Sequence, residues 1–156
     1  MTQIGDIETI DSERLLNEWR WLCPQILKLI DRNAFGDLFL RDEAGRVHML
    51  NVGSVEFAPV AESVSEFTEL ASTPAKQDEW FAVTSMKAAR ERGLVPGPEQ
   101  CIGFSTPVVF AESNGLDSAY IANLYEHVAF LGDIHRQIAT APDGAKVRLV
   151  VRSQKG

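Results

Sequence analysis

The sequence predicts a single α+β domain over residues 1–156, with a mainly antiparallel sheet flanked by helices. Residues 33–60 contain three short β-prone runs separated by two tight turns, which is typical of a β-meander. Apolar residues recur at helical spacing before and after this stretch. A length of 156 residues with 45% hydrophobic residues is typical of one folded core. The predicted regions are an N-terminal helical part (1–32), the meander (33–60), helices (61–93), and strands with a long helix and a final strand (99–152).

The N-terminal region is predicted to be helical in two pieces. Ser12 is the expected N-cap of the first helix, and Leu15, Leu16, Trp19 and Leu22 recur along one face. Pro24 ends this helix, and residues 25–32 are expected to form a second short helix or helical turn. Trp19 and Trp21 are interpreted as core anchors, although a binding surface is the alternative.

The meander is predicted to have strands at residues 38–41, 46–52 and 55–60. The first turn ends in Gly45, which is expected at positive φ, and Gly53 and Ser54 form the second turn. Both faces of the middle strand carry apolar side chains, so we expect a central strand in a sheet covered on both sides.

The second half is predicted to be mostly helical. Ser63 and Glu66 match a capping box that starts a helix ending near residue 71, and a second helix spans 77–92 with Gly93 as its cap. Strands at 101–104 and 108–110 are expected to extend the sheet. Asp117 or Ser118 should cap a long helix over 119–139, in which Gly132 allows close packing against a strand, and residues 146–152 form the last strand.

Composition narrows the possible functions. The chain has no apolar run of the roughly 18 residues that cross a bilayer and no leader-like start, which predicts a cytoplasmic protein with no membrane partner. Cys23 and Cys101 are expected to be reduced and buried. The net charge of −7 argues against direct binding of nucleic acid.

Acidic residues are unevenly distributed along the chain. No Lys or Arg lies between Arg92 and Arg136, whereas five acids do. This pattern favours a basic protein partner, and the alternative is that acidity only maintains solubility. The predicted interface residues are Glu112, Asp117 and Glu126.

The sequence contains no common motif for catalysis, cofactor binding or metal binding. The chain has neither a Gly-rich phosphate loop nor HExxH, and residues 103–107 lack the second Gly of a nucleophile elbow. His48, His127 and His135 are therefore interpreted as structural histidines. The sequence predicts no enzyme activity, no cofactor and no metal.

Three polar residues stand within apolar segments. Asp37, Asn51 and Gln137 are expected to form a buried hydrogen-bonded network between sheet and helix. The alternatives are a partner contact surface, or a ligand-binding or catalytic cleft near His48, Asp37 and Gln137.

Three segments together resemble a known family. They are NAFGDLFLRD…GRVHMLN (33–51), EQCIGF…P (99–107) and NLYEHVAFLGDIHRQI…PDG (123–144). From about Trp19 to Val151, the chain resembles the C-terminal domain of type VI secretion DNase immunity proteins. It departs from that pattern at 109–115, where a Leu-Gly-Gly segment is common, and at Asn51, where an acid is usual.

The resemblance implies a non-enzymatic protein that binds a cognate toxin in the cytoplasm of the producing cell. The expected function is thus neutralisation of a toxin, a basic nuclease, by direct binding. The alternatives are a small ligand-binding module, an enzyme of unknown reaction, or a stand-alone regulatory adaptor.

Overall fold

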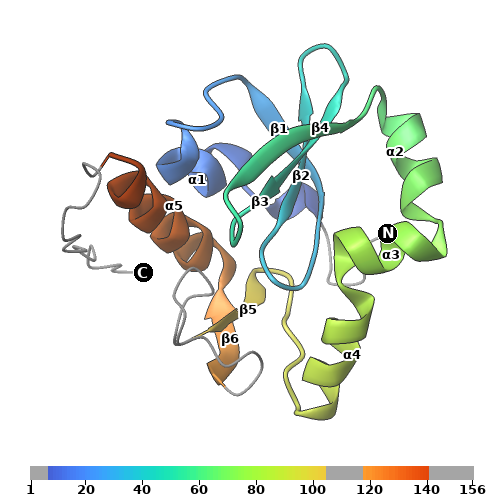
Figure 1. The fold of residues 1–156 in the computed structure, drawn as a ribbon, viewed down its shortest axis with the longest axis vertical. Helices are drawn as coiled ribbons and strands as arrows, with labels where there is room; N and C mark the ends of the chain where they lie inside the picture. The colour runs from blue at the N-terminus through green and yellow to red at the C-terminus, as the bar shows by residue number, and fades with distance from the viewer. Residues whose placement is uncertain (1–6, 105–117, 141–156) are drawn as a thin grey trace.

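The computed structural model describes residues 7–104 and 118–140 (Figure 1). Glu112, Asp117 and the strands expected at 108–110 and 146–152 lie outside the described residues. The elements are η1 (Ile7–Thr9), α1 (Ser12–Leu16), η2 (Asn17–Trp19), β1 (Leu27–Arg32), β2 (Leu38–Asp42), β3 (Val47–Asn51), β4 (Glu56–Ala61), α2 (Val64–Ala71), α3 (Pro74–Phe81), α4 (Val83–Glu91), β5 (Gln100–Phe104), β6 (Ala119–Asn123) and α5 (Leu124–Thr140).

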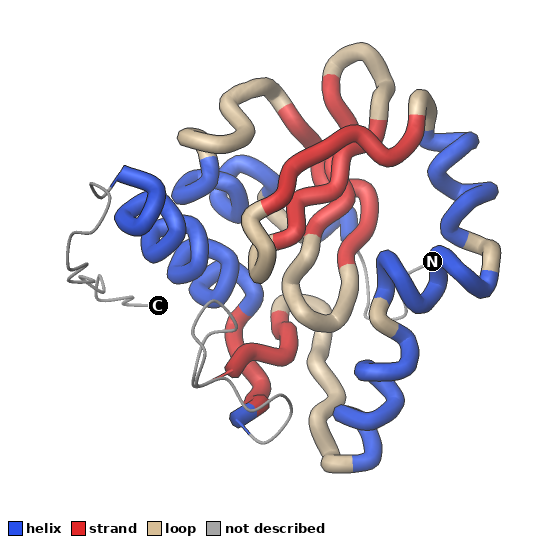
Figure 2. The backbone as a smooth tube through the Cα atoms, in the orientation of Figure 1, coloured by secondary structure: helices blue, strands red, loops and turns tan. Residues whose placement is uncertain are grey.

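The predicted α+β class and meander are confirmed. A four-stranded antiparallel sheet has the order β1-β2-β3-β4, with β3 between two neighbours as expected (Figures 1 and 2). Phe39 pairs with Met49 across β2 and β3, and Leu50 pairs with Phe57 across β3 and β4. Gly45 has a φ of 89°, so the first turn is also as predicted.

The second N-terminal helix predicted at 25–32 is wrong, because β1 occupies most of this range. Leu27 and Leu29 are buried while Lys28 between them is exposed, the period of a strand. The apolar residues of this segment also fit a helix, and pairing with β2 makes it a strand. The N-cap of α1 is also corrected: Asp11 accepts from the backbone of Glu13 and Arg14, whereas the Ser12 hydroxyl accepts from Leu29 N at 2.9 Å.

Helices cover both faces of the four-stranded sheet (Figure 1). On one face, Leu38, Leu40 and Leu50 pack with residues of α1 and α5. On the other, Phe39 lies 5.1 to 5.6 Å, between ring centroids, from Phe67 of α2 and from Trp80 and Phe81 of α3. The meander therefore separates two apolar clusters, as the alternation along β3 predicts.

The helices after the sheet begin with the predicted cap, but the second predicted helix is divided into two. Ser63 Oγ accepts from Glu66 N at 3.1 Å, which starts α2. The single helix expected at 77–92 is instead α3 and α4, divided at Ala82, whose φ is 50°. The break lets Asp78 Oδ1 accept from Thr84 N at 3.0 Å and cap α4 in place of a missing N-cap side chain.

The C-terminal strands do not extend the main sheet. β5 pairs with β6 in a separate two-stranded sheet, and residues 119–123, expected in the long helix, belong to β6. The helix α5 begins at Leu124 because Asn123 Oδ1 accepts from Glu126 N at 3.1 Å. One bond from Ile102 N to Ala34 O, 2.8 Å long, connects β5 to the loop between β1 and β2.

Close packing at Gly132 is present, but its neighbour is the N-terminal turn and not a strand. A Cβ at Gly132 would lie 2.6 Å from Glu18 O and 2.8 Å from Trp19 Nε1. Trp19 is fully buried and donates to Val128 O at 2.7 Å, so it anchors η2 on α5 as the sequence suggests. Within the described residues, no helix is long and apolar enough to cross a bilayer.

Candidate functional site

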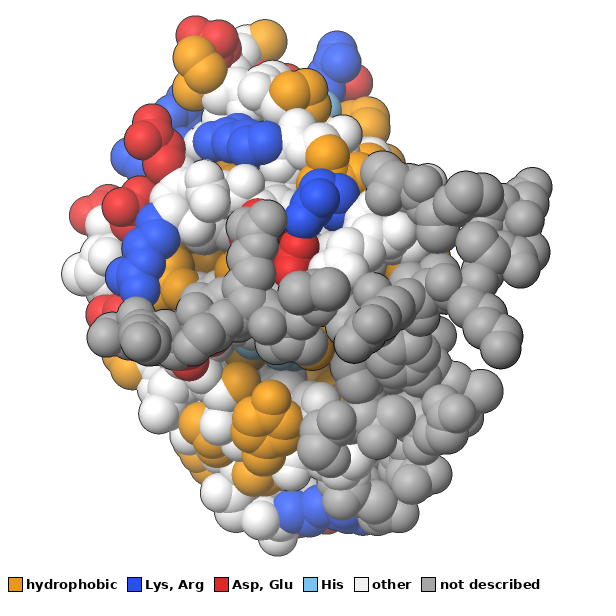
Figure 3. Space-filling model, turned by 90° about the vertical axis from the view of Figure 1, so that its left-hand side faces the viewer, with side chains coloured by type: hydrophobic (Ala, Val, Ile, Leu, Met, Phe, Trp, Pro, Cys, Tyr) orange, Lys and Arg blue, Asp and Glu red, His pale blue; other side chains and the backbone are white. Residues whose placement is uncertain are grey.

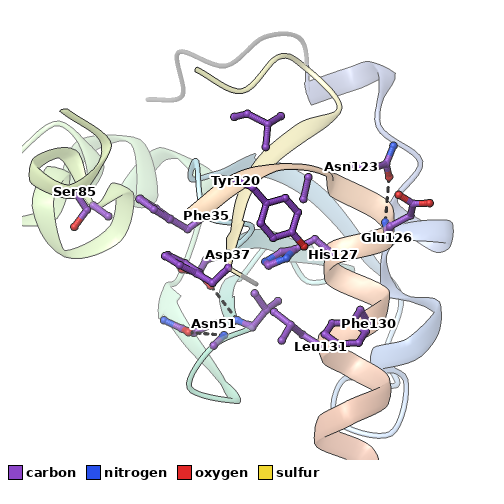
Figure 4. Close-up of a pocket in the computed structure, with 16 residues that line it drawn as sticks. Phe35, Asp37, Asn51, Ser85, Tyr120, Asn123, Glu126, His127, Phe130 and Leu131 are labelled. Carbon is purple, nitrogen blue, oxygen red and sulfur yellow. Dashed lines mark hydrogen bonds between the residues drawn. The ribbon is translucent and has the colours of Figure 1, made fainter. Parts of the chain in front are cut away.

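A cavity of about 700 Å³ opens between the two sheets and the helices α4 and α5. Its aromatic wall residues are Phe35, Phe104, Tyr120 and Phe130. Its polar residues among those described are Asp37, Asn51, Ser85, Asn123, Glu126 and His127 (Figure 4). Volume and lining are those of a ligand or side-chain binding pocket.

Asp37 is held in the cavity by the turn that precedes β2. Its Oδ2 accepts from Asn33 Nδ2 at 2.9 Å, and its Oδ1 accepts from Val52 N at 3.0 Å. Asn33 Oδ1 in turn accepts from Phe35 N and Asp37 N, and Asn33 Nδ2 also donates to Trp80 O. Burial raises the pKa of Asp37 above its ordinary value, and these two hydrogen bonds oppose the rise.

Asn33 was not singled out from the sequence, although it organises this part of the site. It is 4% exposed and connects the turn to α3. The sequence Asn-Ala-Phe-Gly-Asp could have indicated this role, because an Asn at the start of a turn often accepts hydrogen bonds from nearby backbone N–H groups. Here Asn33 accepts from the N–H groups two and four residues ahead.

His127 occupies a space that two glycines leave open. A Cβ at Gly36 would lie 2.9 Å from His127 Cδ2, and a Cβ at Gly103 would lie 3.2 Å from its Nδ1. Burial lowers the pKa of His127 to about 4, against a hydrogen bond with the Phe35 backbone that raises it. The imidazole is therefore neutral near pH 7.

One side of the cavity is lined by β6 and the first turn of α5. Tyr120 is 47% exposed, and Glu126 lies in the first turn of α5, where the helix dipole favours an acid. Seen from the side of α5 and β6, hydrophobic side chains gather on the lower half of the surface (Figure 3). The exposed Tyr120 and the acid Glu126 thus line the same cavity.

The structure brings together some of the residues named from the sequence and separates others. Asp37, Asn51 and Glu126 line the same cavity. Asn51 Oδ1 accepts from Gly53 N and Ser54 N, so it shapes the turn before β4. Gln137 is half-buried further along α5, outside the residues that line the cavity.

His48 and His135 are not among the described residues that line the cavity. His48 Nε2 is 2.8 Å from Asp42 Oδ2, and this hydrogen bond lowers the pKa of Asp42. His135 Nε2 contacts Val52 O at 3.2 Å. The alternative hypothesis from the sequence was a cleft near His48, Asp37 and Gln137. Of these three residues only Asp37 lines the cavity, and the histidine beside it in the lining is His127.

Charge in the cavity is one-sided. Asp37 and Glu126 are acidic, and none of the described lining residues is Lys or Arg. Arg32, which is 1% exposed, binds the carbonyls of Gly97, Pro98 and Gln100 instead. Among the described residues, no cluster of three His, Cys, Asp or Glu side chains could hold a metal ion.

Fold and site define an α+β protein in which a meander sheet and a smaller hairpin sheet enclose an acidic, aromatic-walled cavity. In comparisons with known proteins, no protein-family model matches the chain, and no curated protein matches it.

Proposed function

We propose that this chain is a non-enzymatic binding protein of the immunity type, which neutralises a basic nuclease toxin by direct contact. The observation that carries the proposal is the place where the three resembling segments meet. Segment 33–51 contributes Phe35, Asp37 and Asn51 to the cavity, 99–107 contributes Phe104, and 123–144 contributes Glu126 and His127. Segments far apart in sequence thus build one surface feature.

The electrostatics support a basic partner. A nuclease that grips a phosphate backbone carries clustered Lys and Arg, and a complementary acidic surface speeds its association. Asp37 and Glu126 lie where no described lining residue offers a competing cation. The resemblance places such a protein in the cytoplasm of the cell that makes the toxin.

The hydrogen bonding supports a preorganised binding site. Both Asp37 oxygens accept from amides, and the His127 ring is held between glycines. Groups held in this way keep one geometry, as recognition of a partner requires.

The direct test uses the product of the reading frame beside this gene, which we expect to be a nuclease. We expect the chain, mixed in equal amount with that nuclease, to abolish DNA cleavage, and the complex to weaken as salt rises. Undiminished cleavage with the chain in excess, and no complex in size-exclusion chromatography, would reject the proposal.

A second candidate function is binding of a small molecule, which the cavity volume favours. About 700 Å³ lies within the range of roughly 300–1,000 Å³ typical of ligand pockets. A compound that co-purifies with the chain and raises its melting temperature would support this candidate.

A further inference from the structure

The carboxylate of Asp37 has unfilled acceptor capacity that faces the cavity. A carboxylate offers about four lone-pair sites, and Asp37 uses one on each oxygen. Both donors, the Asn33 amide and the Val52 N–H, are uncharged. Half-buried Asp37 is therefore an acid without a described cationic partner, in a place where burial already penalises its charge.

The walls beside Asp37 suit a flat cation on an apolar stem. Phe35 stacks on Phe104 with ring centroids 6.3 Å apart and planes within 7°. Phe35, Tyr120 and Asp37 lie around the same space in Figure 4. Aromatic faces attract cations, and planar guanidinium stacks on them while the carboxylate accepts its N–H groups.

Among the described residues that line the cavity, the others add negative charge and none is Lys or Arg. Glu126 lines the cavity from the first turn of α5, and His127 is neutral near pH 7. Asn51 and Asn123 are also at the cavity, but each Oδ1 already accepts from backbone N–H groups. Charge complementarity therefore points to a cationic occupant.

We propose that the cavity receives an arginine side chain of the protein partner, with its guanidinium on Asp37, its stem against Phe35 and Tyr120, and Glu126 at the entrance. The assignment of the arginine to the nuclease rests on the proposed function. Arginine fits better than lysine because guanidinium is weakly hydrated and planar, whereas ammonium is a strongly hydrated point charge.

The test uses N-acetyl-arginine methylamide as the probe and its citrulline analogue as the uncharged control of nearly the same shape. Amide signals of Val52, Gly53 and Ala122 are followed by ¹H–¹⁵N NMR. We expect saturable shifts at these residues with the arginine probe and at least tenfold weaker binding of the citrulline probe. Equal binding of the two probes, or no shifts at about 50 mM probe, would overturn the proposal.

Variants locate the binding. Asp37→Asn removes the charge and should abolish the shifts, while Glu126→Gln should weaken binding a few-fold. Glu69→Gln, the same change at an exposed residue of α2, is the matched control and should bind as the unaltered chain does. If Asp37→Asn fails to fold, Tyr120→Leu replaces it, because Tyr120 is exposed and its loss should weaken binding several-fold. Full binding by the variant used would overturn the proposal.

The outcomes separate this proposal from the proposed function. Arginine binding without any complex with the nuclease would keep the cavity assignment and reject the nuclease as partner. A nuclease complex of unchanged affinity with Asp37→Asn, or with Tyr120→Leu where that variant takes its place, would keep the immunity function and reject the arginine.

Discussion

The backbone conformation at two turn residues, Gly45 and Val55, limits which side chains fit there. Gly45 has a φ of 89°, and a Cβ there would meet nothing within 4 Å. Any penalty for a side chain at this position is therefore one of backbone strain alone. Val55 at φ 60° is a β-branched exception, and it packs against the core cluster of Leu38 and Leu50.

Replacing Gly45 by Val should lower the free energy of unfolding by about 1 kcal/mol or more, because β-branched residues fit positive φ poorly. Urea denaturation measures the change. Gly45→Asn is the control and should cost less, since Asn tolerates this region. An unchanged midpoint for the Val variant would contradict the turn.

The second residue-scale prediction concerns pH and His127. Its pKa is about 4 in the folded chain against 6.5 ordinarily, so the unfolded chain binds the proton more tightly. The neutral ring stabilises the fold fully above pH 6.5, and this contribution is lost as pH falls towards 4. The full loss is on the order of 3 kcal/mol.

Unfolding free energies from urea curves at pH 7 and at pH 4.5 test this linkage. We expect His127→Gln to lose less stability over this interval than the unaltered chain. Asp37 acts in the opposite direction, because its raised pKa favours the protonated folded form as pH falls. Identical losses in both chains would contradict the assignment to His127.

At the scale of elements, Arg32 connects the end of β1 to the loop before β5. Its Nη2 donates to the carbonyls of Gly97, Pro98 and Gln100 at 3.2, 3.1 and 2.8 Å. The loop has little regular structure of its own, so this guanidinium supplies hydrogen bonds that a strand would otherwise make.

Arg32→Met should lower stability by roughly 3 kcal/mol, because the part-buried carbonyls of this loop lose a charged donor that is itself buried. Arg46→Met is the matched control, since Arg46 pairs with Glu62 on the exposed surface and should cost within about 0.5 kcal/mol. Chemical denaturation compares the two. Equal effects would show that the buried bonds contribute nothing beyond surface pairing.

At the scale of the whole molecule, a net charge of −7 and an acidic cavity should steer a basic partner. Glu126 is the described member of the predicted interface, and the other two, Glu112 and Asp117, lie outside the described residues. Their role in an interface stays a prediction.

Glu126→Lys should slow association with the nuclease roughly threefold or more at low salt, with a smaller effect at high salt. Glu69→Lys makes the same charge change on α2, away from the cavity, and is the control. Stopped-flow or surface-binding kinetics at two ionic strengths provide the rates. Equal association rates for the two variants would show that only the net charge of the chain matters, and that the position of Glu126 at the cavity does not.

Local features of the sequence determined much of this fold. The meander with Gly45 in its turn, the Ser63 capping box and the anchoring role of Trp19 depend on contacts within a few residues or on a short periodic pattern. Asp37, Asn51 and Glu126 could be named because polar residues in apolar segments, or acids in a segment without bases, are visible without coordinates.

Only the tertiary structure decided the remaining features, because they depend on pairing between distant segments. Residues 27–32 fit both a helix and a strand until β2 pairs with them. β6 replaces the first turn of a predicted helix because β5 is its neighbour. In the sequence His127 is one histidine on a helix. Its place in the cavity with Asp37 depends on Gly36 and Gly103, from two other segments, which leave room for its ring. The cavity exists only where these segments meet, and no single stretch of sequence encodes it.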